Sequence, residues 1–159
     1  MEDLGGKFSK VPGEAFGRIL NRDLFLFLLD LEVKRARRYQ NFLCLVFFKI
    51  KQFSREGNVG DLMKDCYQTL SDLLMEQIRE SDIIGSIELG KLLVLLPYAD
   101  SQAGAHVKSR LEDALKYYDL RSKGFEIIVD QVCFPVNGTD TIDLIRKASK
   151  NRHQDPNLD

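Results

Sequence analysis

Two runs of consecutive apolar residues constrain the fold of this chain more than any other feature. Residues 43–48 are Leu-Cys-Leu-Val-Phe-Phe, and residues 92–96 are Leu-Leu-Val-Leu-Leu. A short run without polar alternation is typical of a strand that is covered on both faces of its sheet. The sequence therefore predicts a sheet with helices packed against both faces.

Patterns of helical spacing alternate with these runs along the chain. The predicted order is a helix (21–39), a strand (43–48), a helix (62–79), a hairpin (83–96), a helix (103–118), a strand (125–134) and a short closing helix (142–145). Alternation of this kind predicts an α/β sandwich with helices on both faces of a mixed, mainly antiparallel sheet. A chain of 159 residues is long enough for one domain with a substantial core.

The charge and hydropathy of the chain exclude several classes of function. The sequence has 23 basic and 24 acidic side chains, so no long-range field favours binding to nucleic acid. Its apolar runs are much shorter than the roughly 20 residues of a membrane helix, and the N-terminus does not resemble a signal peptide. We expect neither a nucleic-acid partner nor membrane insertion.

The three cysteines, Cys44, Cys66 and Cys133, are widely spaced and set among apolar residues. An odd number without metal-ligand spacing favours reduced core thiols over a disulfide framework or a zinc site. We therefore expect three free thiols and a cytoplasmic location.

Several motifs follow one another in a recognisable order. Residues 14–22 are E-A-F-G-R-I-L-N-R, residues 48–53 are F-K-I-K-Q-F, and residues 79–82 are R-E-S-D. Residues 88–92, E-L-G-K-L, follow at the turn of the predicted hairpin. In their order and spacing these segments resemble the D-x-L-T-G-L-x-N-R, I-D-I-D-x-F, R-x-x-D and G-G-D-E-F motifs of bacterial diguanylate cyclases, the GGDEF family.

The resemblance to the GGDEF family covers about residues 14–150 and implies a nucleotide-cyclase-like sandwich. Residues 1–13 would be a lead-in or linker, and residues 151–159 a flexible tail. The family's terminal lysine-bearing segment, A-L-Y-x-A-K, is missing from the chain.

The resemblance also implies where a metal site would lie. Diguanylate cyclases condense two GTP molecules with the help of divalent metal ions, which require oxygen ligands. The family takes these ligands from the first Asp of I-D-I-D and from an acidic residue of the signature, where this chain has Lys49 and Gly90. Lys91 replaces the signature glutamate, and an ammonium group competes with a metal ion. We expect a degenerate, inactive domain with no catalytic residues, no metal and no cofactor.

The R-x-x-D motif forms a product-binding inhibitory site in many GGDEF proteins, completed by an arginine on the following helix. Arg79 and Asp82 match the motif, and Arg110, thirteen residues past Pro97, matches the further arginine. Arginine forks can donate to guanine O6 and N7, and a carboxylate can accept from guanine N1 and N2. The resemblance therefore implies a cyclic di-GMP receptor that signals to a partner protein or a tethered domain.

A structural interpretation of the same residues stays open. Arg79 and Asp82 would form an ion pair at a helix end, with Arg110 simply solvated, and such a surface pair contributes only about 0–1 kcal/mol. The chain would then be a nucleotide-independent interaction or dimerisation module. The consecutive apolar residues 25–29 would supply an exposed patch for a partner or a homodimer, unless both sides of that helix are buried.

Overall fold

The computed structural model describes residues 19–53 and 59–149, and the predicted lead-in (1–13) and tail (151–159) lie outside these ranges. The elements, in chain order, are β1 (Ile19–Leu20), α2 (Arg22–Tyr39), β2 (Leu43–Gln52), α3 (Val59–Gln77), β3 (Ile83–Glu88), β4 (Lys91–Pro97), α4 (Ser101–Leu115), a 3₁₀ turn (Arg121–Lys123), β5 (Phe125–Phe134) and α5 (Thr141–Ser149).

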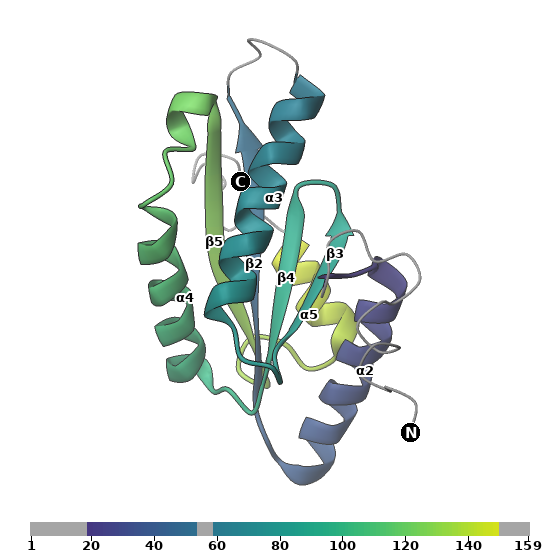
Figure 1. Cartoon of the computed structure of the whole chain (residues 1–159). Helices are drawn as coiled ribbons and strands as arrows, with labels where there is room; N and C mark the ends of the chain where they lie inside the picture. The colour runs from purple at the N-terminus through teal and green to yellow at the C-terminus, as the bar shows by residue number, and fades with distance from the viewer. Residues whose placement is uncertain (1–18, 54–58, 150–159) are drawn as a thin grey trace, which may run out of the picture.

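The strands form one five-stranded sheet in the order β1-β3-β4-β2-β5 (Figure 1). Neighbouring strands are antiparallel except for β1 and β3, which are parallel. The predicted α/β sandwich with a mixed, mainly antiparallel sheet is confirmed. The sequence patterns did not predict β1, since a strand of two residues carries no periodicity.

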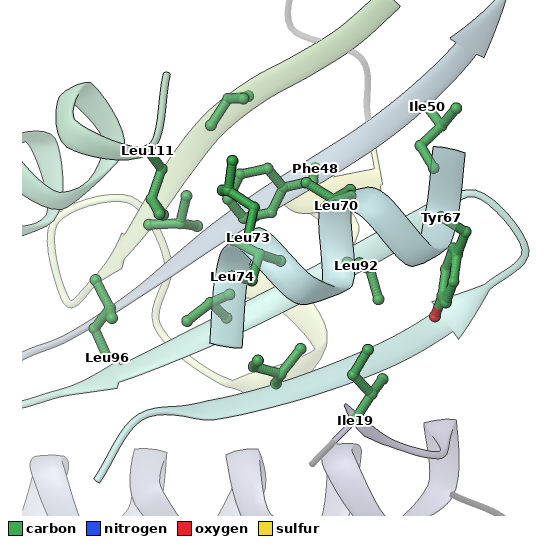
Figure 2. Packing of buried hydrophobic residues seen from close by; sticks show 14 of the residues in the cluster. Ile19, Phe48, Ile50, Tyr67, Leu70, Leu73, Leu74, Leu92, Leu96 and Leu111 are labelled. Carbon is green, nitrogen blue, oxygen red and sulfur yellow. The ribbon is translucent and has the colours of Figure 1, made fainter. Parts of the chain in front are cut away.

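The two faces of the sheet each carry a hydrophobic core. Val46 and Phe48 of β2 belong to the core beneath α3 and α4, and Figure 2 shows Phe48 beside Leu70 of α3. Leu45 and Phe47 belong to the other core, which α2 and α5 cover. Successive residues of a strand point to opposite faces, so burial on both faces explains the uninterrupted apolar runs.

Some element ends differ from the predictions. Helix α3 ends at Gln77 and not near residue 79, and α4 begins at Ser101 because the Asp100 side chain accepts a hydrogen bond from the Ala103 N–H at 2.8 Å. Strand β2 extends beyond its apolar run to Gln52, which pairs with Phe125 of β5. Backbone pairing thus lengthens a strand beyond its buried segment.

The expectation of three free thiols is wrong for two cysteines. Cys44 of β2 and Cys133 of β5 lie directly opposite each other and form a disulfide. The register of two strands far apart in the sequence brings them together, and cysteine spacing alone does not give that register. Cys66 is a free, buried thiol, and burial raises its pKa to about 11.

Helices within residues 19–53 and 59–149 are nowhere long and apolar enough to cross a membrane.

Candidate functional site

Arg79 and Asp82 lie in the turn between α3 and β3. The backbone N–H of Arg79 donates to Oδ2 of Asp82 at 2.9 Å, and the backbone N–H of Asp82 donates to the Arg79 carbonyl at 3.0 Å. The Asp82 residue is only 8% exposed, whereas Arg79 is exposed. The carboxylate therefore closes the turn, and Arg79 lies at the surface.

Arg110 lies on α4 and reaches the end of α3. Its Nη2 donates to the carbonyl of Gln77, the last residue of α3, at 2.8 Å. Carbonyls at a helix C-terminus lack intrahelical partners and carry partial negative charge, so a guanidinium group stabilises them. This bond uses one of the several N–H donors of the guanidinium and holds it beside the R-x-x-D turn.

The three predicted residues line one groove of about 540 Å³. This volume lies within the range of about 300–1,000 Å³ found for small-molecule sites. The turn between β4 and α4 and the exposed side of α4 form the rest of the groove, which includes Tyr98, Asp100, Gln102 and His106. The structure therefore brings together all three residues of the predicted site.

Among the groove residues that were not predicted from the sequence are His106 and Tyr98. His106 is exposed and precedes Arg110 by one helical turn, so helical spacing from Arg110 could have identified it. Tyr98 carries no such signal, because its place in the groove depends on the path of the β4–α4 turn. The interpretation of Arg110 as simply solvated is wrong, since its guanidinium bonds to Gln77.

Of the two residues that the resemblance aligns with metal ligands of diguanylate cyclases, Gly90 lies in the β3–β4 turn and Lys49 lies beside it on β2. Lys49 of β2 pairs directly with Lys91 of β4, and Gly90 adopts a φ of 81° in the turn, where its carbonyl accepts from the Ile50 N–H at 2.8 Å. Lys91 forms an ion pair with Glu88 at 2.6 Å, and this hydrogen-bonded contact holds the pKa of Glu88 below its usual range.

The described ranges contain no cluster of three or more His, Cys, Asp or Glu side chains that could hold a metal ion. Beside the β3–β4 turn, Lys49 and Lys91 place two ammonium groups on adjacent strands, and the Glu88 carboxylate pairs with that of Lys91. This arrangement is more suited to an anion than to a divalent cation.

Comparison with solved structures reveals the same fold. A diguanylate cyclase (DGC) protein from Thermotoga maritima is 17% identical with a TM-score of 0.69, over 82% of this chain and 93% of that chain. The GGDEF domain of YfiN from Pseudomonas aeruginosa is 20% identical with a TM-score of 0.69, over 82% and 85%. A microbial GGDEF domain described as interacting with cyclic di-GMP is 19% identical with a TM-score of 0.63, over 82% and 80%.

No protein with a curated description matches the chain. The family model for the GGDEF domain of diguanylate cyclases matches residues 15–155, which is most of the sequence. This chain therefore belongs to the GGDEF family.

Proposed function

We propose that this chain is a GGDEF domain without cyclase activity that binds cyclic di-GMP in the groove between the R-x-x-D turn and α4. The observation that carries the proposal is that Arg79, Asp82 and Arg110, from two separate elements, line the same groove. Cyclic di-GMP presents two phosphates and two guanine bases. The arginines offset phosphate charge or donate to guanine O6 and N7, and the carboxylate accepts from N1 and N2.

The geometry of the groove favours binding because its charged residues are already held in place. The Asp82 carboxylate fixes the backbone of Arg79, and the Gln77 carbonyl fixes the guanidinium of Arg110. Groups ordered before binding lose less conformational entropy when the ligand arrives. The relative described as interacting with cyclic di-GMP supports the choice of ligand class.

The absence of cyclase activity is proposed from Lys49, Gly90 and Lys91. Two-metal chemistry on GTP requires oxygen ligands close to the triphosphate. Lys49 and Gly90 stand at the two aligned ligand positions, and neither has an oxygen atom in its side chain. Lys91 is the direct cross-strand partner of Lys49 and adds a second positive charge beside them. The protein would thus respond to the nucleotide and pass the signal to a partner protein, a tethered domain or a second copy of itself.

Isothermal titration calorimetry of cyclic di-GMP tests the proposed receptor. We expect micromolar or tighter binding to the unaltered protein and at least a tenfold weaker affinity for Arg79→Ala, because hydrogen bonds to charged groups contribute about 1.5–3 kcal/mol. Arg121→Ala is the matched control, since this exposed arginine lies outside the groove. Equal affinity of Arg79→Ala and the unaltered protein would contradict the proposed site.

A parallel incubation with GTP and magnesium tests the proposed inactivity, for which we expect no release of pyrophosphate and no cyclic di-GMP. Turnover would contradict the inactivity but not the groove. If cyclic di-GMP gives no heat of binding, the receptor proposal fails and the interaction-module hypothesis takes its place.

A further inference from the structure

Tyr98 has an unusual backbone conformation. Within residues 19–53 and 59–149 only two residues other than glycine have a positive φ, Gln40 and Tyr98, and Tyr98 has a φ of 61°. The left-handed region is unfavourable for a residue with a Cβ atom, whereas glycine adopts it readily. Strained residues of this kind cluster at ligand sites, where the surrounding structure holds them in place.

Core packing does not explain the aromatic side chain at this position. Tyr98 is 65% exposed, whereas Ala99 beside it is buried. A large aromatic residue contributes to stability mainly through burial, and Tyr98 is mostly exposed. A glycine or a small polar residue would fit the same turn with less strain.

The turn that carries Tyr98 is anchored on both sides. Pro97, which precedes it, is paired with Leu43 in the sheet, and Asp100, which follows, caps α4 through the Ala103 N–H at 2.8 Å. The ring is therefore presented from a rigid support.

Tyr98 lines the groove that contains Arg79, Asp82 and Arg110. Tyr98 also borders a much smaller hollow beside Asn41 and Phe42. The residue therefore lies where the groove and this hollow meet. The groove thus combines groups suited to phosphates and base edges with one planar apolar surface.

We infer that Tyr98 stacks on a guanine base of the nucleotide in this groove and so helps to determine its specificity. The inference rests on the proposed function. The arginines and Asp82 recognise charge and base edges, whereas the ring of Tyr98 recognises the face of a base, a contact that hydrogen bonds cannot supply. Loss of a base–aromatic stack weakens nucleotide binding by about 5- to 150-fold.

Two substitutions separate stacking from other roles of the residue. Tyr98→Phe keeps the ring and removes the hydroxyl, while Tyr98→Leu keeps an apolar side chain under the same backbone strain and removes the ring. We expect Tyr98→Phe to bind cyclic di-GMP as tightly as the unaltered protein, and Tyr98→Leu to bind about tenfold more weakly. Thermal unfolding of both variants checks that the fold is retained.

A spectroscopic signal tests stacking directly. In the complexes of the unaltered protein and of Tyr98→Phe, we expect the guanine H8 proton to show an upfield ring-current shift that is absent with Tyr98→Leu. An affinity of Tyr98→Leu equal to that of the unaltered protein would overturn the inference. Equal losses in Tyr98→Phe and Tyr98→Leu would also overturn it, because they would indicate a hydroxyl contact.

Arg79→Ala, measured in the same series, distinguishes the two proposals. If Arg79→Ala binds weakly while Tyr98→Leu binds normally, the receptor proposal stands and the stacking inference fails. If the unaltered protein does not bind cyclic di-GMP, both are wrong.

Discussion

The residues from which inactivity is proposed and those proposed to bind the nucleotide lie near opposite ends of β4. Lys91 begins β4, beside the β3–β4 turn, and Pro97 ends it, beside the groove. Figure 1 shows these two ends of β4 far apart in the sheet. Substitutions at the turn can therefore remove metal ligands without disturbing Arg79 or Arg110.

The cysteines allow a residue-scale prediction. In denaturant without reductant, a thiol reagent should modify one group per chain, Cys66, because Cys44 and Cys133 form a disulfide. In the native protein at neutral pH even Cys66 should react very slowly, since it is buried and a thiol with a pKa of about 11 stays protonated. Mass spectrometry after alkylation counts the modified groups, and modification of all three thiols without reductant would contradict the disulfide.

At this scale the sequence predicted three charged residues of the groove but not its shape. Motif spacing can be read from a single sequence, and it identified Arg79, Asp82 and Arg110. Turn geometry and strand register determine the features that were not predicted. These are the bond from Arg110 to Gln77, the backbone conformation of Tyr98 and the pairing of Cys44 with Cys133. These features arise from contacts between segments far apart in the chain.

At the scale of helices and strands, apolar patterning predicted most elements because burial decides where they form. The ends of the elements were less predictable. The Asp100 cap sets the start of α4, and pairing with β5 extends β2 beyond its apolar run. Caps and ladders of this kind involve few residues and leave little trace in hydrophobic periodicity.

The contact between α2 and β3 gives an element-scale prediction. A Cβ atom added at Gly85 of β3 would overlap the ring of Phe25 of α2, which is fully buried. We expect Gly85→Ala to lower the free energy of unfolding by about 1–3 kcal/mol, as overpacked cores do, and to lower the melting temperature by several degrees. Thermal and urea denaturation measure the change.

A second substitution tests the physical reason for that loss. Phe25→Ala in the Gly85→Ala background removes the ring atoms Cγ and Cδ2, two of the three atoms nearest to the added methyl group, so its cost should be smaller than the cost of Phe25→Ala alone. Strictly additive effects of the two substitutions would show that the Phe25 ring does not cause the destabilisation.

At the scale of the whole molecule, the groove is built where α4 meets the sheet. Helix α4 packs closely on β2. A Cβ atom added at Gly104 of α4 would lie only 2.7 Å from Sγ of Cys44 in β2. The other wall is the turn that Asp82 closes. A ligand between these tightly packed parts is expected to bind with side-chain adjustments and little backbone movement.

The most direct test of the central claim is a titration of cyclic di-GMP into ¹⁵N-labelled protein, followed by backbone amide chemical shifts. We expect saturable shifts concentrated on the α3–β3 turn around Arg79, the β4–α4 turn around Tyr98, and the face of α4 that carries Arg110. No shifts at millimolar ligand, or shifts confined to the β3–β4 turn around Gly90, would contradict it.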